Sequence, residues 1–235
     1  MAQSYDAVVI GSGPNGLAAA IELTRRGAEV CIIEASDTVG GGVRSAELTL
    51  PGFVHDVCSA VHPLGILSPF FRDLPLGKHG LEWVLPPASV AHPFDDEPAA
   101  MLYKSLDTTG ETLHDDGPAW SRSFKPLLNN AQELLKDILG PLRIPKHPVQ
   151  MARFGLPGLR SAVGFANSRF KGDRAKALFA GCAAHSILPL ETPLTAAVGT
   201  LFALSGHVED WPVAKGGSGA ISKALASYFE SLGGT

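Results

Sequence analysis

The sequence has few cysteines and almost no net charge. Its 235 residues contain three cysteines, Cys31, Cys58 and Cys182, which lie far apart and form no C-x-x-C pair. This spacing argues against a disulfide framework and against a dithiol redox centre. The 19 Lys and Arg side chains against 23 Asp and Glu give a net charge of −4, so the composition predicts no nucleic-acid partner.

Targeting, membrane-spanning and metal-binding patterns are also missing. The N-terminus has neither a basic region nor an apolar signal core, and the first strand is predicted to begin at Tyr5, so we expect a cytoplasmic protein. In the most apolar stretch, residues 177–204, a histidine, a glutamate and two prolines prevent the roughly 20 apolar residues of a membrane span. The eight histidines show no metal-ligand spacing, so no metal site is predicted.

Glycine, in contrast, stands at informative positions near the N-terminus. The apolar residues 5–10 lead into residues 11–16, Gly-Ser-Gly-Pro-Asn-Gly, and then into a helical pattern that ends near Gly27. A second apolar run, residues 29–33, follows and ends on Glu34. The order strand, glycine turn, helix and strand is typical of a dinucleotide-binding βαβ unit.

Each glycine of this turn has its own predicted role. Gly11 permits the tight turn off the strand, Gly13 lets the backbone approach a pyrophosphate, and Gly16 allows the helix to pack closely on the strands. Pro14 and Asn15 begin the helix, whose free N–H groups and positive dipole end point at the phosphates. These five residues are predicted to bind the cofactor.

The acidic residue at the end of the second strand predicts how the adenosine half of the dinucleotide cofactor is bound. Glu34 is placed to accept hydrogen bonds from the ribose hydroxyls, and its charge disfavours the ribose phosphate of NADP. Ala35 follows it directly and is counted with it among the cofactor-binding residues. The βαβ unit alone leaves both NAD and FAD open.

A second glycine cluster, Gly40-Gly41-Gly42, comes shortly afterwards, with Arg44 close behind. Glycines let the backbone pass beside a flat or phosphate-bearing ligand, and an arginine can pair with a pyrophosphate through its fork of donors. A flexible loop with a solvated arginine is the alternative. The position directly after a nucleotide unit favours cofactor binding by Gly41, Gly42 and Arg44.

The pattern changes twice along the chain, which predicts a domain with an insertion. Residues 1–62 form the βαβ unit and the second glycine motif, residues 63–206 an inserted substrate or cap region, and residues 207–235 a return to the first domain. The predicted fold class is α/β, with a Rossmann-like domain and an inserted α+β domain. Only two clear parallel strands are present, so the sheet is incomplete, and we expect a missing C-terminal segment or a second chain to complete it.

The predicted elements of the later regions follow from proline spacing and apolar periodicity. A small antiparallel sheet is expected from strands over residues 81–85, 89–92 and 99–103. Helices are expected over residues 127–139, 149–168, 173–186, 193–206 and 220–232. Ser218 precedes the last of these helices, so we expect its side chain to cap that helix.

These motifs together resemble the FAD-dependent oxidoreductases of the amine oxidase and phytoene desaturase superfamily, including their pyridine nucleotide-disulfide oxidoreductase domain relatives. In that superfamily the glycine turn, the glutamate at the strand end and a second Gly-Gly motif all serve FAD. Residues 50–56 resemble its Gly-Phe segment before an aspartate, and residues 215–219 its later Gly-Gly segment. The resemblance extends over essentially the whole chain.

The resemblance implies hydride removal or transfer at a C–H bond of an apolar, carotenoid-like or amine substrate. Because the flavin carries this chemistry, no catalytic side chain is assigned. The substrate-side candidates are His62, His185, Gly216 and Gly217. A lipid-like substrate would need peripheral contact with a membrane, which the sequence leaves open.

Three alternatives remain beside this interpretation. An NAD-dependent dehydrogenase would share the first βαβ unit, although the second glycine cluster argues against it. An escort-type binding protein of the same fold need not keep its phosphate turn, whereas here Gly11, Gly13, Gly16 and Glu34 are all present. An inactive, truncated product of the same fold is the third.

Overall fold

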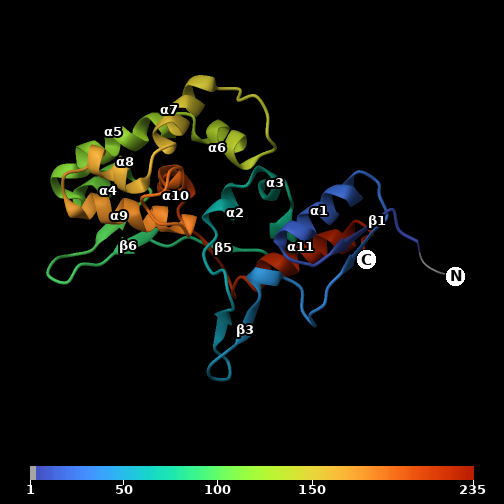
Figure 1. Cartoon of the computed structure of the whole chain (residues 1–235). Coiled ribbons are helices and arrows are strands. Elements are labelled where there is room, and N and C mark those ends of the chain that lie inside the picture. Colours follow the sequence, from blue (N-terminus) through green and yellow to red (C-terminus); the bar gives the residue numbers. More distant parts are fainter. Residues whose placement is uncertain (1–3) are drawn as a thin grey trace. The chain divides into compact units, whose positions relative to one another are not determined.

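The computed structural model describes residues 4–235, which divide into two compact units (Figure 1). Unit 1 holds the described residues up to His62 together with Phe70–Val84 and Pro212–Thr235. Unit 2 holds Pro63–Pro69 and Leu85–Trp211. The segment Phe70–Val84 lies within the expected insertion but belongs to unit 1, because its leucines are buried in the core of that unit.

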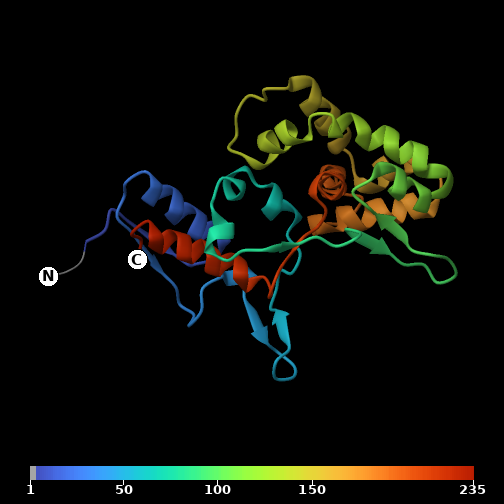
Figure 2. The ribbon, with the colours of Figure 1, turned by 180° about the vertical axis from the view of Figure 1, so that it is seen from behind.

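Unit 1 is built on the parallel pair of strands β1 (Ala7–Ile10) and β2 (Val30–Ile33), joined through helix α1 (Pro14–Arg25). Helix α11 (Gly219–Ser231) packs against α1, and the two lie side by side in both Figure 1 and Figure 2. Thr235 exchanges two backbone hydrogen bonds with β2. The expected α/β fold class with an incomplete parallel sheet is confirmed, since two strands form this sheet within residues 4–235.

Short elements complete unit 1 and the start of unit 2. They are the 3₁₀ turn η1 (Gly41–Val43), the antiparallel strands β3 (Ser45–Glu47) and β4 (Val54–Asp56), helices α2 (Pro63–Leu67) and α3 (Pro69–Arg72), the 3₁₀ turn η2 (Leu76–His79), and the antiparallel strands β5 (Trp83–Val84) and β8 (Val213–Ala214).

The pairing of β5 corrects the expected sheet. We expected strands near residues 81–85, 89–92 and 99–103 in one antiparallel sheet, but only the last two pair with each other, as β6 (Val90–His92) and β7 (Ala100–Leu102). Strand β5 pairs instead with β8, from the far end of the sequence. The apolar side chains of Leu81 and Ala214 are buried in the same cluster, which holds β5 in unit 1.

Unit 2 is mostly helical. Its helices are α4 (Leu106–Thr112), α5 (Gly117–Leu128), α6 (Ala131–Leu139), α7 (Pro148–Gly158), α8 (Ala162–Arg169), α9 (Asp173–Ala183) and α10 (Thr195–Glu209), with 3₁₀ turns η3 (His114–Asp116) and η4 (Ala184–Ser186). Within residues 4–235, no helix combines the length and the apolar character needed to cross a membrane.

Two of the expected helices are interrupted. The apolar stripe over residues 127–139 spans the end of α5 and the whole of α6, with Asn129 and Asn130 between them. Asparagine hydrogen-bonds readily to nearby backbone and favours turns. Residues 149–168 divide into α7 and α8 because the Ser161 hydroxyl accepts a hydrogen bond from Gly164 N (3.0 Å) and so begins a new helix.

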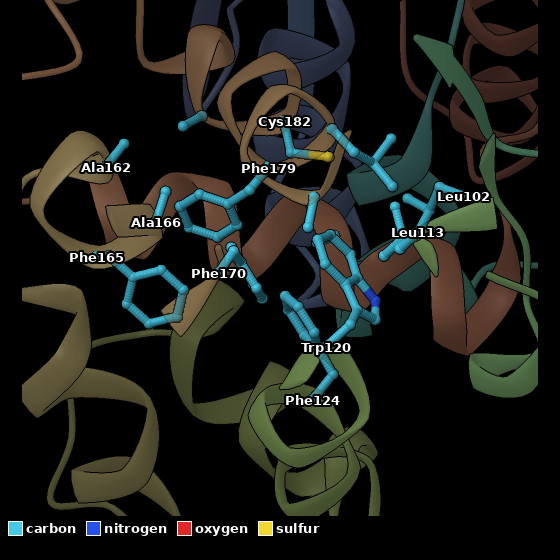
Figure 3. Packing of buried hydrophobic residues seen from close by; sticks show 14 of the residues in the cluster. Leu102, Leu113, Trp120, Phe124, Ala162, Phe165, Ala166, Phe170, Phe179 and Cys182 are labelled. Atoms are coloured by element: carbon cyan, nitrogen blue, oxygen red, sulfur yellow. The ribbon is translucent and has the colours of Figure 1, made fainter. Parts of the chain in front are cut away.

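The core of unit 2 is aromatic (Figure 3). The ring of Trp120 lies 4.6 Å from that of Phe124 and 5.5 Å from that of Phe170, centroid to centroid. Phe165 stacks on Phe179 at 4.7 Å, and the Cys182 thiol is buried in the same cluster. This packing fixes the positions of α5, α8 and α9 relative to one another.

The burial of the cysteines predicts selective reactivity. Cys58 is exposed, whereas Cys182 is fully buried and its burial raises the thiol pKa to about 12. We expect a thiol reagent such as 5,5′-dithiobis(2-nitrobenzoate) to modify Cys58 in the native protein and Cys182 only after unfolding. Mass spectrometry of tryptic peptides would locate the label, with Cys58→Ser as the control; fast native labelling of Cys182 would contradict the burial.

Candidate functional site

The glycine turn of unit 1 presents the N-terminus of α1. Gly11 has a φ of +93°, a conformation that favours glycine, and a Cβ on Gly16 would overlap the carbonyl group of Gly11. Gly13 is the N-cap residue and Pro14 follows it, and no side chain caps the helix. The first N–H groups of α1 are therefore left for an anion.

The two glycine clusters meet in space. A Cβ on Gly41 would lie 3.1 Å from the Cα of Gly13, closer than side chains normally pack. The backbone N–H of Gly40 donates to the carbonyl oxygen of Ser12 at 3.1 Å. The predicted cofactor residues Gly13 and Gly41 thus form one surface of backbone without side chains, although they are 28 positions apart in the sequence.

Glu34 lies at the end of β2 and is bonded to the same turn. Its Oε2 accepts hydrogen bonds from the backbone N of Ser12 (2.9 Å) and from Ser12 Oγ (2.6 Å), while Oε1 accepts from Ser36 N (2.9 Å). The hydrogen bonds from the Ser12 side chain and backbone lower the pKa of Glu34 to about 2. The carboxylate is therefore ionised at neutral pH and holds the turn in place.

Arg44 connects the second glycine cluster to the loop that follows β2. Its Nε donates to Gly41 O and its Nη1 to Ser36 Oγ, both at 3.0 Å. Within the described residues Arg44 forms no ion pair, so its charge is available to an anion. Arg44, Gly216 and Lys223 line a cavity of about 340 Å³ in unit 1.

The N-terminus of α11 is held by side chains from the β3–β4 hairpin. Asp56 Oδ1 accepts from Ser218 N (2.6 Å) and from Ser45 Oγ (2.7 Å), and Ser45 Oγ accepts from Gly219 N (2.8 Å). Burial opposes the ionisation of Asp56, but the hydrogen bonds from Ser45 and Ser218 outweigh it and lower its pKa. Asp56 and Ser45 therefore accept hydrogen bonds from the free N–H groups at the start of α11, the role that we predicted for the Ser218 side chain.

The predicted cap by the Ser218 side chain is wrong. Ser218 Oγ lies 2.8 Å from His62 Nε2 instead and accepts from no N–H of the first turn of α11, where Gly219 N donates to Ser45 Oγ. The ring of His62 also lies 6.0 Å from that of Trp83. Burial lowers the pKa of His62, with Asp56 acting in the opposite direction, so this histidine is neutral at pH 7.

The remaining candidate residues are distributed as follows. Gly217 lies beside this network, since a Cβ there would meet Ser45 Oγ at 2.6 Å, and Gly216 precedes it with a φ of +80°. His185 belongs to unit 2, where its ring stacks on Phe202 at 4.3 Å between centroids. Asn15, Ala35 and Gly42 are exposed. Within residues 4–235 no cluster of His, Cys, Asp or Glu has the makeup of a metal site.

Sequence reasoning missed the roles that the serines of the site play, including that of Ser218. Ser12 and Ser36 bind Glu34, and Ser45 and Ser218 connect Asp56 to α11 and to His62. The available signal was a short hydroxyl residue beside each glycine cluster. Serine often pairs with nearby backbone or carboxylate groups, as Ser36 does with Glu34, but the partners of Ser12 and Ser218 come from distant parts of the sequence.

Comparison with known proteins agrees with this geometry. The model of the NAD(P)-binding Rossmann-like domain matches residues 9–74. The structure of putrescine oxidase bound to putrescine superimposes with a TM-score of 0.58 at 20% identity, over 97% of this chain and 49% of that one. The chain has the fold of the FAD-dependent amine oxidases. The resemblance to that superfamily is thereby confirmed at the level of fold.

Two curated proteins are similar to this chain in sequence as well. The rat pyridine nucleotide-disulfide oxidoreductase domain-containing protein 2 is 43% identical over 79 residues, 33% of this chain and 13% of the relative. A limonene dehydrogenase polypeptide of Castellaniella defragrans is 25% identical over 159 residues, 68% of this chain and 28% of the relative. The chain thus spans less than a third of either relative and about half of the matched amine oxidase fold.

Proposed function

We propose that unit 1 binds FAD and that the chain serves a flavin-dependent oxidoreductase. The observation that carries this proposal is the contact between the two glycine clusters at Gly13 and Gly41, beside the uncapped start of α1. A nicotinamide dehydrogenase needs only the first cluster. The second glycine cluster, with Arg44 close by, provides further backbone contacts beyond the first turn, and we propose that FAD uses them.

The residues would divide the cofactor between them. Gly13 and the first N–H groups of α1 would receive the pyrophosphate, with Arg44 as a further donor. Glu34 would accept the ribose hydroxyls, for which its position at the end of β2 is suited. When bound, FAD supplies the capacity to accept a hydride, and the chain supplies binding and orientation.

The substrate that we propose is apolar or an amine, oxidised at a C–H bond. Two likenesses support this proposal: one relative is named for limonene, a hydrocarbon, and a structural neighbour is an oxidase of the amine putrescine. As in the sequence interpretation, no side chain of this chain is assigned a catalytic role.

Titration with FAD and with NAD tests the proposal. The purified chain, freed of endogenous nucleotide, is titrated with FAD and followed by flavin fluorescence and by the flavin absorption bands. We expect saturable FAD binding that excess NAD does not displace. Tight NAD binding together with no FAD binding would replace the proposal with a nicotinamide dehydrogenase, and binding of neither would leave a non-catalytic protein of this fold.

Replacing Glu34 by alanine should weaken FAD binding roughly ten- to a hundredfold, because charge-assisted hydrogen bonds to the ribose are lost. Equilibrium dialysis against FAD measures the change. Ser12→Ala is the matched control, since it removes the 2.6 Å hydroxyl bond to Glu34 but leaves the carboxylate. Equal losses in both variants would mean that Glu34 acts only by holding the turn, and an unchanged affinity in Glu34→Ala would contradict ribose binding.

A further inference from the structure

We infer that unit 2 carries a binding site for a single amphiphilic carboxylate, in a pocket between α5, α7, α8 and α10. The pocket has a volume of about 450 Å³, which is within the usual range for small-molecule sites. All of its lining residues belong to unit 2. The inference does not depend on flavin binding by unit 1.

The inner wall of the pocket is apolar and rigid. Phe124, Leu127, Phe154 and Phe165 line it and are buried. Phe124 and Phe165 are also part of the aromatic core, as Figure 3 shows. Because their other contacts are fixed, the wall is formed before any ligand arrives, which lowers the entropic cost of binding.

A buried amide holds the helices around the pocket. Gln150, 4% exposed on α7, donates from Nε2 to the carbonyl oxygens of Pro126 and Leu127, each at 2.9 Å. Both carbonyls lie in the last turn of α5. This pair of hydrogen bonds joins α5 to α7 along one side of the pocket.

The outer edge of the pocket is cationic. Arg122 from α5, Arg153 from α7 and Arg169 from α8 line it, and all three are exposed. Within residues 4–235 none of the three is part of an ion pair, and no carboxylate lines the pocket. The Arg169 guanidinium carbon lies 5.7 Å from the centroid of the Phe165 ring. Three guanidinium groups without a carboxylate partner above an apolar wall attract an anion and disfavour an amine.

An unpaired buried hydroxyl lies in the same wall. Thr200 on α10 is 4% exposed, and its Oγ1 has no hydrogen-bond partner within the described residues. Buried hydroxyls in proteins nearly always have a partner. Thr200 lines the pocket beside the phenylalanines, but its Oγ1 is shielded from solvent, so the inference rests on the apolar wall and the three arginines.

The ligand that fits both features has an apolar body and an anionic head. The body would cover the phenylalanines and Leu127, and the carboxylate would lie among the three arginines. Arginine suits this head because its fork of N–H donors matches the two oxygens of a carboxylate.

Calorimetric titration of the full chain with decanoate, decanol and decylammonium tests the inference. We expect decanoate to bind saturably, one per chain, and at least about tenfold more tightly than decanol, with decylammonium weakest. Added salt should weaken decanoate binding and leave decanol binding unchanged. Equal affinities for decanoate and decanol, or no saturable binding of decanoate, would overturn the inference.

Variants locate the site. The triple change Arg122→Met, Arg153→Met and Arg169→Met keeps the apolar stems and should reduce decanoate affinity to that of decanol. Arg25→Met is the matched control, because Arg25 is an exposed arginine on α1 of unit 1. An unchanged decanoate affinity in the triple variant, or an equal loss of decanoate affinity in Arg25→Met, would contradict a site in this pocket.

A membrane surface presents the same anionic chemistry, so a second assay separates the two sources. Binding to phosphatidylglycerol vesicles is measured by co-sedimentation. Binding to monomeric decanoate with the same arginine dependence supports the single-ligand site. Binding to vesicles without binding to monomeric decanoate would overturn it in favour of a membrane-docking surface.

Discussion

Replacing Gly13 by valine is expected to reduce FAD affinity at least about a hundredfold while leaving the chain folded. Gly13 has a φ of −66°, which any residue adopts, and a Cβ there would lie 3.9 Å from Gly41 Cα, an ordinary contact. The methyl groups of valine would instead occupy the space before the first turn of α1. A phosphate excluded from it loses charge-assisted hydrogen bonds worth about 1.5–3 kcal/mol each.

Gly16→Ala provides the contrast. A Cβ at Gly16 overlaps the Gly11 carbonyl, so this smaller change should lower the thermal midpoint itself. Flavin fluorescence titration and circular dichroism melts on both variants separate loss of binding from loss of folding. Wild-type FAD affinity in Gly13→Val would place the cofactor elsewhere, and unfolding of Gly13→Val would contradict the open space at this position.

Acidification from pH 7 to pH 4 is expected to remove about 3 kcal/mol of the stability of unit 2 through His207. This side chain is 5% exposed, and its Nε2 accepts a hydrogen bond from Trp120 Nε1 at 2.9 Å. A protonated ring has no acceptor for that donor. Burial lowers the pKa of His207 to about 4, against hydrogen bonds to Lys104 and Tyr103 that act in the opposite direction.

The direction of the effect follows from proton binding. Below about pH 6.5 the unfolded chain protonates this histidine while the folded chain does not, so stability falls until about pH 4 and then levels off. Urea unfolding at several pH values, followed by tryptophan fluorescence, measures the slope. His207→Gln should be less stable at pH 7 and flatter between pH 6.5 and 4, whereas exposed His147→Gln should keep the wild-type slope. A wild-type slope in His207→Gln would contradict the assignment.

The first βαβ unit could be predicted because its determinants are local. The apolar runs specify β1 and β2, and the glycines at positions 11 and 16 specify the turn, since a side chain there would be strained or would overlap the backbone. The helical content of the middle region was also accessible from its periodicity. The helix boundaries were not, because the Asn129-Asn130 pair interrupts the apolar stripe without changing its period, and Ser161 begins α8 through a side-chain hydrogen bond that periodicity ignores.

Pairings between distant segments were beyond the sequence. Strand β5 has the same local pattern whether it pairs with β6 or with β8, and burial of Leu81 beside Ala214 decides for β8. Ser218 has the position of a helix cap, but its hydroxyl pairs with His62, and Ser45 accepts from the Gly219 N–H. These outcomes depend on competition for one partner, which only the assembled structure resolves.

The sequence by itself determined the kind of fold and the positions at which the backbone must carry no side chain. Glycine conformation and apolar periodicity are properties of short segments, so both can be read locally. The tertiary structure alone decided that Gly13 contacts Gly41, that Glu34 holds Ser12, and that three arginines surround one pocket of unit 2. The physical reason is that such contacts join residues far apart in the chain, and their geometry is set by the packing of all the elements between them.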